Sequence, residues 1–216
     1  MQGRPMKTTS THTISGIHQH KLRCLTPVLK KWIILNKNIA EAWANNDVPW
    51  WYGERACLSV FAGAIWKVGG IAFEEYSFEK RNKVHGKRIV NGRNDLYFEL
   101  NGEEYIVEAK YSSFGASRLK IGAPGNIQDC LEKARRDIRK CPHSTGQRRL
   151  GIAFVRPYFT MHQKHAVSKK IKKWVENLQK LDYSCAAWVF PKGSRCFKGN
   201  YYAPGIAVLI KEVRRA

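Results

Sequence analysis

Two acidic residues and one lysine stand out because their types and spacing suit hydrolytic chemistry at a phosphate. Glu108 and Lys110 lie two positions apart in a segment with strand character, so their side chains would point to one side, about 6.5–7 Å apart. Asp95 lies in the preceding segment, across a predicted hairpin. Two converging carboxylates can hold Mg²⁺, which lowers the pKa of a bound water. A lysine beside them can orient or deprotonate that water, or stabilise the developing negative charge.

A simpler explanation is an exposed ion pair between Glu108 and Lys110, with no chemistry. Against it, the surrounding segment is apolar on both alternating faces, as in an interior strand covered on two sides. The hydrophilic end of such a strand then needs a separate reason. Glu99 shares a face with Asp95 and can substitute for it as a metal ligand.

The hairpin itself is well marked. Alternating residues over 95–100 and 104–111 flank Asn101-Gly102, a turn signal that favours a tight connection between two strands. The pattern therefore predicts that Asp95 faces the end of the strand that carries Glu108 and Lys110.

A helix over residues 54–67 is predicted to add a fourth candidate. Leu58, Phe61 and Ile65 form its buried stripe, and Glu54 stands on the same face one turn earlier. A carboxylate on an inward face is costly unless a cation meets it. Glu54 is therefore either a further metal ligand or an acid favoured in the first turn by the helix dipole.

The remaining elements define the fold class. Apolar periodicity predicts helices over 27–47, 126–140 and 164–181, and strands over 71–77, 150–155, 185–190 and 206–210. Residues 80–93 are expected to be a loop or a ragged strand start, and the aromatic run at 50–52 a packed corner. We expect a flexible lead-in (1–16), a helical extension (17–50) and an α/β domain (51–216) whose central mixed sheet is flanked by helices.

Charge is distributed unevenly in this basic chain, whose formal net charge is +21. Residues 1–50 carry 7 basic and 2 acidic side chains, residues 51–110 carry 9 and 9, and residues 111–216 carry 22 and 6. A basic surface attracts a polyanion through counterion release. An acidic pocket within that surface would repel the same polyanion unless a cation bridged them, which favours a metal site at a phosphodiester.

These motifs resemble those of the PD-(D/E)xK nuclease superfamily, the restriction-endonuclease-like fold. The resemblance rests on Asp95, on Glu108-Ala109-Lys110 thirteen residues later, and on the order of elements from Glu54 to Val155. Asn94 stands where the motif has proline.

The resemblance implies a Mg²⁺-dependent endonuclease that acts on DNA, and in which Mn²⁺ can substitute for Mg²⁺. Asp95 and Glu108 match the metal-binding carboxylates, Lys110 the catalytic lysine, and Glu54 the acid on the first helix. Gln128 falls where some members carry an orienting glutamine, although a surface glutamine explains it equally well. The nucleic-acid contacts that we expect are all basic, namely Lys83, Lys87, Arg88, Arg93, Arg118, Lys120, Arg135, Arg136, Arg139, Lys169 and Lys170.

Other functions fit part of the sequence. A catalytically silent DNA-binding protein on the same fold would keep the basic surface, and a ribosome-associated basic protein would explain the charge without the acidic cluster. The expected partner is double-stranded DNA, with a homodimer or a protein partner that supplies target choice, and RNA is less favoured.

The expected location is the cytoplasm. No secretory signal or membrane segment is visible, and the six cysteines are most simply reduced thiols. A zinc site built from Cys130, Cys141 and His143 matches no recognised spacing.

Overall fold

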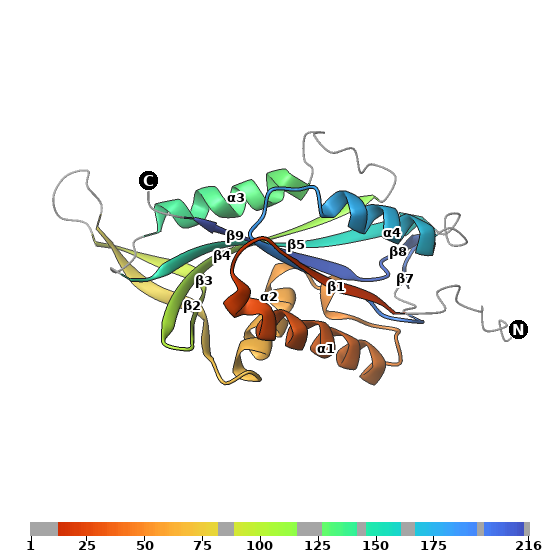
Figure 1. Cartoon of the computed structure of the whole chain (residues 1–216), viewed down its shortest axis with the longest axis horizontal. Helices are drawn as coiled ribbons and strands as arrows, with labels where there is room; N and C mark the ends of the chain where they lie inside the picture. Colours follow the sequence, from red (N-terminus) through yellow and green to blue (C-terminus); the bar gives the residue numbers. More distant parts are fainter. Residues whose placement is uncertain are drawn as a thin grey trace, which may run out of the picture.

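A computed structural model describes residues 13–81, 89–115, 127–141, 146–160, 167–193 and 197–213. Helices cover both faces of one mixed sheet in this part of the chain (Figure 1). The helices are α1 (Thr26–Ala42), α2 (Glu54–Trp66), α3 (Ile127–Lys140) and α4 (Val167–Leu178), with short 3₁₀ turns η1 (Arg23–Leu25) and η2 (Pro49–Trp51). The strands are β1 (Ile14–Gln19), β2 (Ile71–Arg81), β3 (Ile89–Leu100), β4 (Glu103–Gly115), β5 (Arg148–Thr160), β6 (Cys185–Phe190), β7 (Phe197–Lys198), β8 (Tyr201–Tyr202) and β9 (Ile206–Val213). The expected α/β class with a mixed central sheet is confirmed.

The sheet runs in the order β1-β6-β9-β5-β4-β3-β2, with the short β7 and β8 attached at β5. β4 and β5 pair in parallel, and the connection between them contains α3. The other neighbours along this path are antiparallel. Because a parallel pair needs a crossover, α3 is placed over the face of β4 and β5.

The two faces of the sheet bury separate apolar clusters. Alternate residues of β3 and β4, including Phe98 and Val107, pack with α1 and α2. The intervening positions face α3, where Ile106 packs against Ile138. The same alternation places Asp95, Glu108 and Lys110 together on the α3 face.

α3 lies closest to the sheet over Gly151 of β5. A Cβ at Gly151 would come within 2.9 Å of the Arg135 backbone nitrogen, closer than such atoms approach. The absence of a side chain therefore lets α3 sit against the sheet, which matters because α3 carries residues of the site described below.

Several predicted boundaries were wrong. Residues 14–16, expected in a flexible lead-in, belong to β1, and β1 pairs with β6 at the sheet edge. Residues 17–50 contain α1 as expected, but α1 shares the core with α2, so this segment is integrated into the domain. Residues 89–93, expected as a loop or a ragged strand start, belong to β3, and β4 continues to Gly115, beyond its expected end at residue 111. Short stretches of strand that contain glycine and polar residues, such as 14–16 and 89–93, leave little apolar periodicity in the sequence.

The aromatic run does form a packed corner, although Tyr52 remains exposed. Trp50 is fully buried, and its indole nitrogen donates to the Ala203 carbonyl at 3.2 Å. This corner fixes the chain immediately before α2 begins. Among the described residues, no helix combines the length and apolar character needed to cross a membrane.

Candidate active site at a fork between two strands

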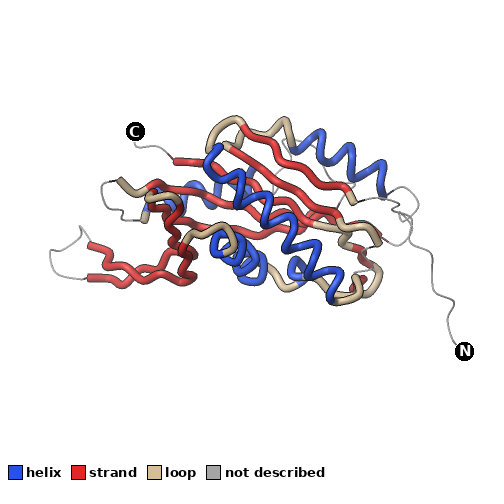
Figure 2. Tube along the Cα trace, turned by 60° about the horizontal axis from the view of Figure 1, so that its bottom comes forward, coloured by secondary structure: helices blue, strands red, loops and turns tan. Residues whose placement is uncertain are grey.

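The site lies where β3 separates from β4. The two strands pair only over Leu96–Leu100 of β3, whereas β3 remains paired with β2 along most of its length. Asp95 is therefore the first residue of β3 beyond its ladder with β4. The far ends of β2 and β3 run out from the body as an arm (Figure 2). Glu75 of β2, between the residues that pair with Leu96 and Asn94, adopts a left-handed backbone with φ of 54°.

Separation of the strands leaves backbone amides of β4 without their β-ladder partners, and two carboxylates take over that role. The Ala109 N–H donates to Asp95 Oδ2 at 2.7 Å. The Tyr111 N–H, two residues along the same strand edge, hydrogen-bonds the Glu54 carboxylate. A buried N–H is costly when it is left unpaired, so these bonds hold both acids at the fork.

Asp95 and Glu108 come into direct contact there. Their carboxyl groups share a hydrogen bond, and Glu108 Oε1 accepts a second bond, at 3.2 Å, from Sγ of Cys141, the residue directly after α3. Burial and the adjacent Asp95 raise the pKa of Glu108 to about 7, against the opposing effects of Cys141 and Lys110. Two carboxylates in contact repel each other, so a proton or a cation between them is required for stability.

Lys110 stands beside this acidic pair. Its Nζ lies 3.9 Å from Glu108 Oε2 and 3.2 Å from Asp137 Oδ2 of α3, and it donates to the Ala109 carbonyl at 2.9 Å. Burial lowers the pKa of Lys110, but the hydrogen bond to Asp137 and the charges of Asp95, Glu108 and Glu54 outweigh this effect and raise it. Lys110 is therefore a fixed positive charge at neutral pH.

Glu54 reaches the fork from the opposite face of the sheet. It is the first residue of α2, and Gly53 before it takes φ of 89°, a conformation that glycine adopts without strain. Tyr111 Oη donates to the Trp50 carbonyl at 2.7 Å, which ties η2 to β4 and fixes the start of α2. Burial and Asp95 raise the pKa of Glu54, opposed by Lys110.

The structure thus brings together four of the five predicted catalytic residues, and it places the fifth elsewhere. Gln128 donates to Glu132 at 3.1 Å and accepts from the Asp182 backbone at 3.3 Å, so its side chain links α3 to the segment after α4. Neither of these partners belongs to the acidic pair, as expected for a surface glutamine. Glu99 lies further down the β3–β4 ladder, opposite Glu104.

Sequence reasoning missed two residues that contact the site, one in α3 and one directly after it. Asp137 pairs with Lys110, and Cys141 donates to Glu108. Their spacing of four residues places both on one helical face, which is the signal that could have found them. Cys141 therefore serves the acidic pair, and the imagined zinc site gains no support because His143 lies outside the described residues.

Arg156 is a half-buried cation on β5, and it lies near Tyr111 of the neighbouring strand β4. Arg156 of β5 donates to Ser113 Oγ at 2.9 Å and to the Trp50 carbonyl at 3.3 Å, and its guanidinium lies 4.1 Å from the centre of the Trp51 ring. Burial lowers the pKa of Arg156, and among the described side chains no carboxylate forms an ion pair with it. With Tyr158 and Tyr201 it lines a pocket of about 220 Å³.

The expected nucleic-acid contacts divide into three groups. Lys83, Lys87, Arg88, Arg118 and Lys120 lie outside the described residues. Arg93 pairs with Glu75 at the base of the arm, Arg136, Arg139 and Lys169 are exposed, and Lys170 is half-buried. Arg135, expected on the outer side of α3, is instead partly buried and pairs with Glu132 at 2.6 Å.

The donor set fits a hard divalent cation. Each acid of the pair contributes oxygen ligands, the kind that Mg²⁺ prefers, and Mg²⁺ commonly binds one or two carboxylates plus water and substrate phosphates. Within the described ranges, no group of three or more His, Cys, Asp or Glu side chains has a geometry that could hold a metal ion as it stands.

In comparisons with known proteins, no protein-family model, curated protein or solved structure matches the chain.

Proposed function

We propose that this protein is a metal-dependent DNA endonuclease of the PD-(D/E)xK type, built on a restriction-endonuclease-like fold. The observation that carries the proposal is the contact between Asp95 and Glu108 at the fork, with Lys110 as the adjacent cation. A stable ion pair on an exposed hairpin would need neither two touching acids nor the burial that Glu108 shows.

Each residue has a defined task in this proposal. Asp95 and Glu108 would hold Mg²⁺, and Glu54 stands close enough to Asp95 to interact with it electrostatically. When bound, the ion would activate a water and offset charge on the scissile phosphate. Lys110, kept protonated by the surrounding acids, would orient that water and stabilise the negative charge that develops.

The α3 contacts keep Lys110 and Glu108 in place. Asp137 holds the ammonium group of Lys110, and Cys141 holds one oxygen of Glu108. Because both contacts come from a single helix face, they constrain the angle between the lysine and the acid. Preorganisation of this kind removes the reorganisation that a flexible site would need at each turnover.

The surrounding charge supports DNA as the substrate. The chain carries a formal net charge of +21, and nine of its 17 acidic residues fall within residues 51–110, the segment that supplies the acids of the fork. The arginine above Trp51 adds a cation with an aromatic face beside the site, a combination that suits a phosphate next to a base. Paired copies of the chain would cut both strands of a duplex.

Supercoiled plasmid tests this proposal. With Mg²⁺ or Mn²⁺ the purified protein should convert it to nicked or linear form, and EDTA should abolish conversion. Linear, branched and single-stranded substrates compared in parallel would give the structural preference. Binding without conversion in either metal would contradict the endonuclease and favour a silent DNA-binding protein.

A further inference from the structure

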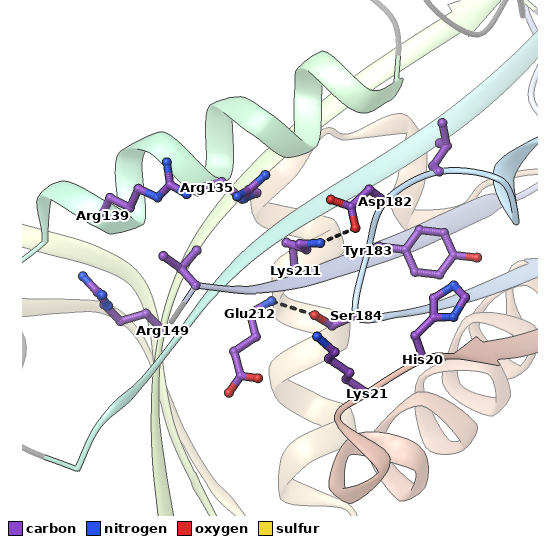
Figure 3. A pocket seen from close by; sticks show the side chains of 12 residues that line it. His20, Lys21, Arg135, Arg139, Arg149, Asp182, Tyr183, Ser184, Lys211 and Glu212 are labelled. Carbon is purple, nitrogen blue, oxygen red and sulfur yellow. Dashed lines mark hydrogen bonds and ion pairs between the residues drawn. The ribbon is translucent and has the colours of Figure 1, made fainter. Parts of the chain in front are cut away.

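A second cavity, of about 910 Å³, lies on the other side of α3 from the acidic pair. Arg135 and Arg139 are one helical turn apart on α3 and point into it, whereas Asp137, which pairs with Lys110, lies on the opposite side of the helix. Figure 3 shows both arginines above the cavity and Lys211 below them. The helix therefore separates the cavity from the candidate active site.

The lining is strongly cationic. Lys21, Arg135, Arg139, Arg149 and Lys211 line the cavity together with His20, against only two acids. Both acids already have cationic partners, since Asp182 pairs with Lys211 and Glu212 pairs with Arg148, a residue outside the lining, at 2.7 Å. The lining as a whole keeps an excess of positive charge.

The cavity wall is fixed by backbone hydrogen bonds between three segments. The Ser184 carbonyl accepts from the His20 and Lys21 amides at 3.0 and 2.9 Å, and the Ser184 amide donates to the Ile210 carbonyl at 2.8 Å. Ser184 Oγ in turn accepts from the Glu212 amide at 3.0 Å. A wall held in this way spares a ligand the cost of ordering it.

These features point to one ligand chemistry. Guanidinium groups match phosphate oxygens with paired hydrogen bonds, and three arginines line one cavity. Its volume lies within the range of about 300–1,000 Å³ typical of small-molecule sites. His20, exposed at the rim and 5.6 Å from the Tyr183 ring centre, offers a flat surface beside the cations.

We propose that this cavity binds the phosphate groups of a nucleotide. The phosphates come either from a free nucleoside polyphosphate or from the backbone of bound nucleic acid. The proposal stands independently of the endonuclease, because binding here needs neither Asp95 nor a metal.

Matched charge reversals test it. Lys21→Glu/Arg139→Glu changes two exposed residues of the cavity, and Lys172→Glu/Lys173→Glu makes the same charge change on exposed positions of α4. Binding of ATP, inorganic tripolyphosphate and a short DNA duplex is measured by calorimetry in EDTA, with circular dichroism to verify folding. The milder Lys21→Gln/Arg139→Gln serves if the reversal variant misfolds.

The cavity variant should weaken phosphate binding about tenfold or more, whereas the α4 variant should change it only about twofold. Selective loss of ATP and tripolyphosphate binding identifies a free nucleotide as the ligand. Selective loss of duplex binding, with a shallower salt dependence, identifies the DNA backbone. Equal weakening by the two variants for every ligand, or no weakening by the cavity variant, overturns the proposal.

Discussion

Lys110→Met is expected to slow DNA cleavage by about 10²–10⁴-fold, the usual contribution of a group that positions or transfers a proton. Methionine preserves the apolar stem of the side chain but removes the charge that contacts Glu108 and Asp137. Duplex affinity should stay within about twofold, because one cation of many contributes little to the total counterion release. Cleavage of labelled duplex and equilibrium binding, measured on the same preparations, separate the two effects.

Lys140→Met is the matched control for this change. Lys140 also pairs with Asp137, at 3.3 Å, but its side chain is 74% exposed. Lys140→Met removes one positive charge from beside Asp137 but leaves the contact between Lys110 and Glu108 in place. A similar loss of cleavage in both variants would mean that Asp137 pairing, and not the position of Lys110, supports activity.

Glu108→Gln is expected to stabilise the metal-free protein near pH 8 while abolishing cleavage. The pKa of Glu108 is about 7 in the folded protein, above its ordinary value of 4.5. As the pH rises from about 4.5 to 7, the unfolded chain releases this proton and the folded protein retains it, so folding stability falls. Glutamine mimics the protonated carboxyl group and avoids the loss.

Denaturant unfolding in EDTA measures this effect. The variant should exceed the wild type by about 1–3 kcal/mol near pH 8 and match it near pH 4, where Glu108 is protonated in both states. Mg²⁺ should then raise the stability of the wild type but not of the variant. Glu104→Gln, at an exposed position of the same strand, controls for the loss of one charge. If Glu108→Gln were less stable than the wild type near pH 8, the proposed repulsion between Asp95 and Glu108 would be contradicted.

Local sequence patterns could predict the elements that present the site. Strand alternation placed Glu108 and Lys110 on one side, the Asn101-Gly102 turn placed Asp95 across from them, and the helical stripe placed Glu54 at the start of α2. These signals depend on neighbours within a few residues, which is why they survive in the folded protein.

The fork itself could not be predicted. It depends on where β3 leaves β4 and stays with β2, a choice between two long-range pairings that have no period in the sequence. Asp137 was missed for a related reason, because its partner is decided by how α3 docks over Gly151. The integration of residues 14–50 depended likewise on the pairing of β1 with β6.

Mn²⁺ binding followed by electron paramagnetic resonance tests whether Asp95 and Glu108 together hold one divalent cation. The wild type should bind one Mn²⁺ per chain, Asp95→Ala should lose it, and Glu99→Ala should keep it, because Glu99 shares the face of Asp95 but lies within the paired part of β3. Equal Mn²⁺ binding by Asp95→Ala and Glu99→Ala, or no binding by the folded wild type, would mean that Asp95 and Glu108 do not form a cation site.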